Sequence, residues 1–396
     1  MKKYYKKYSG LLGILCILFY SCTDSFVIES IAQEDALVIE ASITNENKNQ
    51  IIYLSKAYKL TDSEEVPETN AIVVVKDENQ VSYTFTETTP GTYVSNTKFS
   101  AQIGVNYQLS ITTTNGKVYE SKPEKTISNT VIENVNVELD GNIEGTQEFR
   151  LFVNSFDPTG NSKYYRYTYE ETYKIEAPFW SPLEAIVNNG FVSIVQKADL
   201  NQKVCYQTNT SNTIIQTKTT DLSEDRVQFA VRRIPVDDFI ISHRYSILVR
   251  QHVQSYEAYT YYSVLNKFSN ASDLLSQNQP GFFSSNIYST TNENEKVIGY
   301  FEVTSVSEKR MFFNYRDFFP TGRPDYLETC YFVAPENKNG PGGNPLVLAI
   351  ESKKWIYYDV NLNITDSYPG PYQLIQKECG DCTIYGSNIK PDFWLD

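Results

Sequence analysis

Four cysteines far from the amino terminus have the residue type and spacing that could do chemistry: Cys205, Cys330, Cys379 and Cys382. The last two form a C-x-x-C pair, a spacing used by thiol oxidoreductases and by zinc sites. A redox pair needs a thioredoxin-like βαβ frame, and a structural zinc site typically has two such pairs, whereas the other two cysteines are isolated in the chain. An even number of cysteines in an exported chain instead predicts two disulfides, with all three pairings open. We expect no metal and no cofactor here.

Other residues capable of catalysis are few. The only two histidines, His243 and His252, lie at either end of one expected strand, on opposite faces and about 30 Å apart, so they cannot share a site. The sequence has no G-x-S-x-G elbow, H-E-x-x-H helix, P-loop or dinucleotide fingerprint. Acidic clusters at 170–171, 221–225 and 237–238 resemble the carboxylate pairs of glycosidases, but such clusters are common on an acidic surface. We therefore expect no catalytic residues and a protein that is not an enzyme.

The amino terminus has the layout of a secretory signal. Four lysines precede an apolar run over residues 11–20, which is too short to span a bilayer as a helix, and Ser21-Cys22 follows. A small residue before a cysteine resembles the lipobox of bacterial lipoproteins, in which the chain is cut before the cysteine and the thiol is acylated. We expect a signal peptide over 1–21, lipidation of Cys22 and a tether over 22–34. The alternative is a secreted protein cleaved nearby.

The charge of the chain limits its partners. The net charge is −13, and removal of the four lysines with the signal peptide would bring it to about −17. A nucleic acid would be repelled, and the sequence has no Lys/Arg stripe of the kind that phosphate binding requires. We expect no nucleic-acid partner.

The elements that must position the cysteines, histidines and acidic residues are expected to be mostly strands. Residues 35–126 alternate apolar and polar side chains in seven or so short runs, with a turn every eight to twelve residues, which is typical of an immunoglobulin-like β-sandwich. The Asn115-Gly116 dipeptide predicts a hairpin. The expected strands cover residues 36–43, 50–55, 71–76, 81–86, 92–94, 104–111 and 117–121.

Residues 127–396 predict a larger β-rich domain. Tyr165, Tyr167 and Tyr169 fall on one side of an expected strand over 164–175. A buried aromatic face is one interpretation, and a sugar-stacking platform is the other if that face is open to solvent. One prominent helix is expected near 255–275, capped by Ser255. Further strands are expected over 296–306, 310–315 and 346–350.

Several short motifs, in this order along the chain, resemble a family of Bacteroidota lipoproteins called domain of unknown function 4249. They begin with Cys22 and the runs at 37–41, 91–93 and 116–121, continue at 244–247 and 299–301, and close with 379–382 and 391–394. The resemblance implies an outer-membrane lipoprotein, on its periplasmic or cell-surface face, that is often encoded beside TonB-dependent receptors. We accordingly expect an accessory or binding subunit associated with such a receptor. The alternative is a glycan-binding adhesin or an envelope-structural lipoprotein.

Overall fold

The computed structural model describes residues 36–57, 66–141, 147–269 and 285–396. In these ranges the chain is mainly β, which confirms the mainly β part of the expected fold class. The expected signal peptide, the tether and Cys22 lie outside the described residues. None of the described helices is long and apolar enough to cross a membrane.

The N-terminal strands begin one large sheet, and seven of the eight lie where the sequence predicts them. In the first strand Leu37, Ile39 and Ala41 are buried while the residues between them are more exposed, since successive side chains point to opposite faces. Gly116 has a φ of 81° in the turn of the predicted hairpin. The strands are β1 (Leu37–Thr44), β2 (Ile51–Lys56), β3 (Val66–Pro67), β4 (Ile72–Asp77), β5 (Ser82–Thr89), β6 (Thr92–Ser95), β7 (Tyr107–Thr112) and β8 (Val118–Ser121).

A much later part of the chain completes this sheet. Strand β18 (Ile287–Ser289) pairs with β8, and the first half of β19 (Val297–Asn314) runs parallel to β1, with Leu37 opposite Val297. The second half of β19 pairs antiparallel with β17 (Arg244–Gln254). A single hydrogen-bonded path therefore runs from the N-terminal unit, residues 36–126 with 285–304, into the next unit. The expected boundary between the two domains lies at 126/127 and assigns residues 285–304 to the second domain. In the structure these residues are part of the N-terminal unit.

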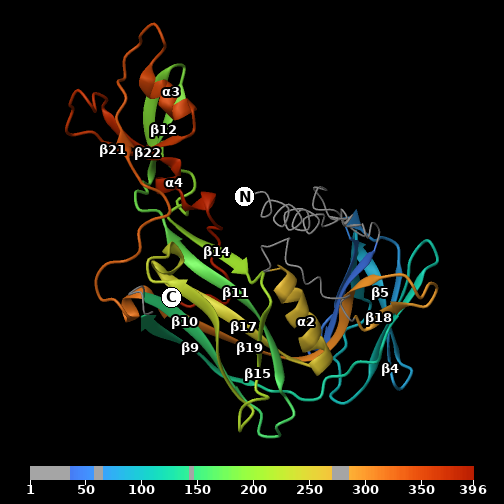
Figure 1. Ribbon diagram of the computed structural model, residues 1–396. Helices are drawn as coiled ribbons and strands as arrows, with labels where there is room; N and C mark the ends of the chain where they lie inside the picture. Colours follow the sequence, from blue (N-terminus) through green and yellow to red (C-terminus); the bar gives the residue numbers. More distant parts are fainter. Residues whose placement is uncertain (1–35, 58–65, 142–146, 270–284) are drawn as a thin grey trace, which may run out of the picture.

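The central unit is built from two sheets that enclose an aromatic-rich core (Figure 1). One is the continuation of the large sheet, in which β17 lies between β19 and β11. The other is three-stranded, in the order β16-β10-β9. The elements of this unit are β9 (Ile132–Gly141), β10 (Gln147–Phe156), β11 (Tyr164–Glu176), β14 (Val204–Thr210), β15 (Ile215–Lys218), β16 (Arg226–Pro235), η1 (Phe239–Ile241) and η2 (Tyr315–Asp317).

The prominent helix is present as α2 (Tyr256–Ser269). The hydroxyl of Ser255 accepts a hydrogen bond from the backbone N–H of Ala258 at 3.1 Å, as expected of an N-terminal cap. Ala258 and Tyr261 pack against Tyr300 of β19. Residues 270–275 of the expected helix lie outside the described residues.

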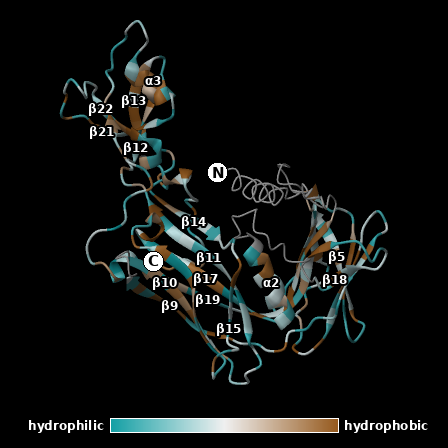
Figure 2. Ribbon diagram, viewed as in Figure 1, coloured by the Kyte–Doolittle hydropathy of each residue, from teal (hydrophilic) through white to brown (hydrophobic). Residues whose placement is uncertain are grey.

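A smaller unit, here called the head, projects from the central unit, and Figure 2 shows apolar residues gathered where α3 meets its strands. Residues 346–350, expected as a strand, form the helix α3 (Pro345–Glu351) instead. The side chain of Asn344 accepts hydrogen bonds from the N–H groups of Leu346 and Val347, and Pro345 occupies the first turn. Both features favour the start of a helix, and they outweigh the preference of Val347 and Ile350 for a strand. The other elements are β12 (Leu183–Asn188), β13 (Phe191–Gln196), β20 (Phe332–Val333), β21 (Trp355–Val360), β22 (Tyr372–Gln376), α4 (Lys377–Gly380) and η3 (Cys382–Ile384).

The four cysteines form two disulfides, as the sequence predicts. Cys205 of β14 is bonded to Cys382, and Cys330 is bonded to Cys379. The C-x-x-C pair therefore does not close on itself. Its two cysteines attach neighbouring turns of the chain to two different segments, at the junction between the head and the central unit.

Candidate functional site

The cysteines are not available as thiolates for redox chemistry or for zinc, because all four are in disulfides. Within the described residues there is no cluster of three or more histidine, cysteine, aspartate or glutamate side chains that could hold a metal ion. The lipidation site expected at Cys22 lies outside the described residues.

The tyrosines of β11 do not form an open platform. Tyr165 and Tyr167 are both 0% exposed, and Tyr169 is partly buried against the same core. The condition for a sugar-stacking surface, a face open to solvent, is therefore not met at Tyr165 and Tyr167. The second sheet of the central unit covers this face, with Tyr167 stacked on Phe229 of β16.

The neighbouring acids Glu170 and Glu171 point to opposite sides of β11 and hold structural contacts. Glu171 accepts hydrogen bonds from Arg232 at 3.0 Å and from the hydroxyl of Tyr245 at 2.6 Å. Glu170 pairs with Arg310 at 3.0 Å. This carboxylate pair is therefore not arranged as the two acids of a glycosidase.

The two histidines lie near opposite ends of β17 and in different surroundings. His252 faces the hydroxyl of Thr168 at 3.4 Å, and its Nδ1 is buried without a hydrogen-bond partner among the described residues. His243 precedes β17 and lies between Glu176 and Arg323. His243 lines a cavity of substantial volume.

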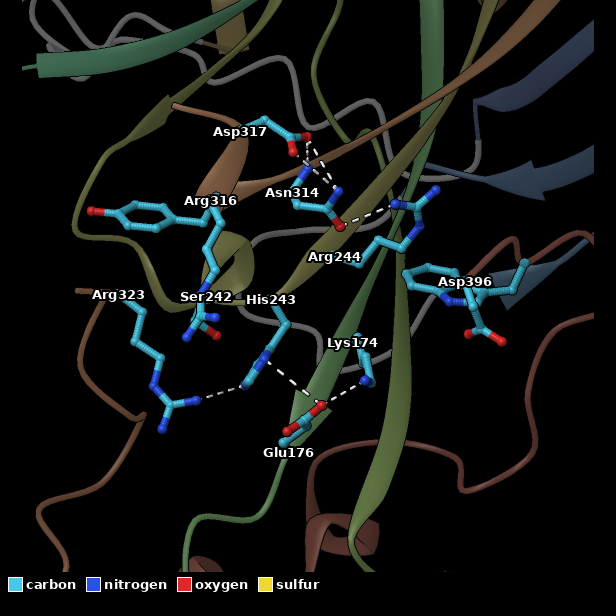
Figure 3. A pocket seen from close by; sticks show the side chains of 12 residues that line it. Lys174, Glu176, Ser242, His243, Arg244, Asn314, Arg316, Asp317, Arg323 and Asp396 are labelled. Atoms are coloured by element: carbon cyan, nitrogen blue, oxygen red, sulfur yellow. Dashed lines mark hydrogen bonds and ion pairs between the residues drawn. The ribbon is translucent and has the colours of Figure 1, made fainter. Parts of the chain in front are cut away.

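This cavity is an open cleft of about 490 Å³ at the edge of the central sheet, where β11 and β19 end and β17 begins. The antiparallel register places Arg244 opposite Asn314 and so brings the three strand ends together. Figure 3 shows their side chains pointing into one space. The lining residues are Lys174, Glu176, Ser242, His243, Arg244, Asn314, Tyr315, Arg316, Asp317, Arg323, Trp394 and Asp396.

Three of these residues have a buried polar atom that no described group satisfies. The atoms are Oγ of Ser242, Nε of Arg244 and Nε1 of Trp394. The Arg and Trp nitrogens can only donate a hydrogen bond, and the hydroxyl can donate as well. A buried donor without a partner costs about 1–3 kcal/mol, and most such groups in proteins are paired. All three residues line this one cleft.

The other charged groups of the cleft are largely engaged with one another (Figure 3). Nζ of Lys174 lies 2.5 Å from Glu176, and Arg323 lies 3.5 Å from Nε2 of His243. Arg244 donates to Asn314 at 3.0 Å through a terminal nitrogen, which leaves its Nε free of that contact. Four cationic side chains and three carboxylate side chains line the cleft, in a chain whose net charge is −13.

The protonation states of His243 and Glu176 decide which groups of the cleft are charged near pH 7. Burial lowers the pKa of His243, and Arg323 adds to the effect while Glu176 opposes it, so the imidazole is neutral near pH 7. Burial favours the neutral form of Glu176, but the bonded Lys174 ammonium outweighs it and lowers the pKa of this carboxyl. The positive charge available to a ligand therefore comes from the arginines, which do not titrate.

Sequence reasoning did not identify this cleft. Arg244 and Trp394 belong to two separate short motifs, and they are 150 residues apart along the chain. An arginine directly after a histidine at the start of a strand was the one local signal, and it does not show which atoms lack partners.

Comparison with known proteins gives a family for this chain. A model of that family matches residues 23–310, well over half of the sequence. The chain belongs to the family described as Domain of unknown function (DUF4249). This DUF4249 match includes Ser242, His243 and Arg244 but ends before Trp394.

Other comparisons add little to the DUF4249 assignment. No curated protein matches the sequence significantly. Among solved structures, the B domain of a biofilm associated protein is 8% identical over 72% of this chain and 90% of that chain. Its TM-score is 0.13, which is too low to support an inference about fold.

Proposed function

We propose that this protein is a non-enzymatic binding subunit of the outer membrane that recognises an anionic group in the cleft. The unpartnered donors of Ser242, Arg244 and Trp394 are the observation that supports this proposal most directly. A carboxylate, sulfate or phosphate group accepts several hydrogen bonds at once and would satisfy them, while the arginine side chains of the cleft would stabilise its charge.

The surroundings of His243 favour binding over catalysis. Acyl transfer would require His243 to accept the proton of Ser242 and a carboxylate to orient the imidazole, both at hydrogen-bond distance. Oγ of Ser242 has no hydrogen-bond partner in the described chain, and Glu176 lies 3.9 Å from Nδ1 of His243. The three side chains are close in space without forming an activated nucleophile.

The cellular part of the proposal rests on the amino-terminal sequence and on the family resemblance. We propose that Cys22 is acylated, that the lipid anchors the chain in the outer membrane, and that the protein assists a TonB-dependent receptor. The N-terminal unit would act as an immunoglobulin-like spacer or docking module. Mass spectrometry of the mature protein should show a diacylglycerol thioether at Cys22. A pull-down from solubilised outer membranes should recover a β-barrel partner, and an unmodified sulfur or the absence of such a partner would refute this part.

Anion binding is tested by titration calorimetry with sulfate and with oxalate at constant ionic strength. We expect one equivalent of at least one of them to bind the wild-type protein. Arg244→Gln should weaken this binding at least about ten-fold, since a hydrogen bond to a charged group contributes about 1.5–3 kcal/mol. Trp394→Phe, which removes the indole N–H and keeps an aromatic ring, should weaken it less.

The matched control is Arg233→Gln. Arg233 is on β16, its side chain is 60% exposed, and it does not line the cleft. If sulfate and oxalate both fail to bind, or if Arg233→Gln weakens binding as much as Arg244→Gln does, the cleft is not an anion site. Circular dichroism on each variant separates loss of binding from loss of folding.

A further inference from the structure

A second cavity, of about 540 Å³, lies where the N-terminal unit meets the central unit, beside the start of α2 (Figure 1). None of the described residues lines both this cavity and the anion cleft. The linker over 122–127, the start of α2, the segment that leads into β18, and β19 all contribute to its wall. Its volume is within the roughly 300–1,000 Å³ of sites that bind small molecules.

Glu124 has a fixed position in this wall. Its backbone N–H donates to the carbonyl of Tyr107 at 2.9 Å, and its own carbonyl accepts from the N–H of Tyr107 at 2.8 Å. Oε1 of its carboxylate accepts hydrogen bonds from the hydroxyl of Tyr300 and, at 3.3 Å, from Nδ2 of Asn286. The carboxylate is therefore held from β19 and from the segment before β18.

The other carboxylate oxygen of Glu124, Oε2, is available to a ligand. It accepts no hydrogen bond from the described chain, and it is not one of the buried polar atoms that lack a partner, so it is accessible from the cavity. Glu124 forms no ion pair with a described residue. Burial raises the pKa of Glu124, and the charges of Glu257 and Glu302 add to this effect. A half-buried carboxylate without a counter-ion favours a cationic group in the ligand.

The rest of the lining contributes charges of both signs and an exposed ring. Lys122 and Lys125 flank Glu124 in the linker, are both exposed, and form no ion pair in the described ranges. With Glu257, the charged side chains of the cavity are two cations and two carboxylates. Tyr256, the first residue of α2, is 59% exposed. Separated charges of opposite sign complement a zwitterion, and the ring offers a surface for its apolar part.

We propose that this cavity binds a short peptide, with the amino-terminal ammonium of the peptide bonded to Oε2 of Glu124. The ammonium supplies the missing counter-ion, and its hydrogen bond to a carboxylate is charge-assisted. The carboxylate end of the peptide lies toward Lys122 and Lys125. A single amino acid carries the same two charges, but the volume of the cavity favours a peptide of about two or three residues.

Titration calorimetry with tri-alanine tests the proposal, because this peptide carries both charges and only small side chains. We expect tri-alanine to bind the wild-type protein. N-acetyl-tri-alanine lacks the ammonium and should bind at least about ten-fold more weakly, since the charge-assisted hydrogen bond is lost. Equal affinity for the acetylated peptide, or no binding of tri-alanine, would overturn the proposal.

Substitutions locate the two ends of the peptide. Glu124→Gln keeps the size of the side chain and an acceptor for Tyr300 but removes the charge, so it should weaken tri-alanine binding at least about ten-fold. The matched control is Glu120→Gln, because Glu120 is also half-buried, lies on β8 just before the linker, and does not line the cavity. If Glu124→Gln binds as tightly as wild type, or if Glu120→Gln weakens binding equally, Glu124 is not the ammonium site.

The double variant Lys122→Gln/Lys125→Gln tests the carboxylate end. It should weaken the binding of tri-alanine but leave that of tri-alanine amide, which has no terminal carboxylate, unchanged. A general loss of structure would weaken both peptides alike. Equal losses for the two peptides in a variant that keeps the wild-type circular dichroism spectrum would show that the lysines do not contact the carboxylate.

Discussion

Arg166 on β11 and Glu302 on β19 form an ion pair across the strand that lies between them. Nη2 of Arg166 is 2.6 Å from Oε2 of Glu302, and the two side chains are 14% and 1% exposed. Gln254, on the intervening strand β17, donates to the other carboxylate oxygen at 2.7 Å. The pair therefore ties three strands together beside the point where β19 passes from one unit to the next.

Removal of one partner should destabilise the protein strongly. Arg166→Met would leave the Glu302 carboxylate buried without its counter-ion, at an expected cost of about 3–5 kcal/mol in the free energy of unfolding. The double variant Arg166→Met/Glu302→Met should recover most of this loss, because it removes the buried charge as well. Urea denaturation measures both. An Arg166→Met variant within about 1 kcal/mol of wild type would show that the pair is not energetically coupled.

The two disulfides should contribute unequally. Cys205 and Cys382 are separated by 177 residues, and Cys330 and Cys379 by 49. A cross-link that closes a longer loop removes more entropy from the unfolded chain, so the first should contribute about 5 kcal/mol and the second about 4. Paired alanine substitutions and urea denaturation test this order. Greater destabilisation by Cys330→Ala/Cys379→Ala would contradict it.

Gly299 should not tolerate a side chain. It lies in β19 with a φ of 139°, and a Cβ built there would be 2.1 Å from the carbonyl oxygen of Ile39 on β1. Gly299→Ala must separate the parallel pair or distort the backbone, at an expected cost of about 3 kcal/mol or more. Gly141→Ala is the control, since a Cβ there meets nothing within 4 Å. Similar melting temperatures for the two variants would refute the prediction.

His252 should make the protein less stable in mild acid. Burial, with the nearby charges of Arg166 and Arg250, holds the pKa of His252 well below 6.5 in the folded state. The unfolded chain takes up the proton first, so this contribution to the free energy of unfolding is intact above pH 6.5. Below pH 6.5 it is lost at up to about 1.4 kcal/mol per pH unit.

The variant His252→Gln cannot take up the proton and should show a shallower loss of stability between pH 6.5 and 5. Some slope should remain, because burial also lowers the pKa of His243. Urea midpoints for the two proteins at a series of pH values provide the comparison. Parallel curves would mean that His252 is protonated equally well in the folded and unfolded chains.

Much of the fold follows from patterns among residues that are close together in the sequence. The alternation in β1 and β11, the Asn115-Gly116 turn and the Ser255 cap each depend on neighbouring residues, and each is present where the sequence indicates it. The α3 segment shows the limit of such reasoning, because the cap at Asn344 decided between two structures that its apolar residues allow equally.

The sequence by itself determined the mainly β class, the helix and the presence of two disulfides, because these follow from side-chain alternation, capping and the number of cysteines. Only the tertiary structure decided that β1 pairs with β19, which cysteines bond, and that Arg244 and Trp394 line the same cleft. These contacts join residues far apart in the chain. Their partners are selected by packing and strand register, which no local stretch of sequence encodes.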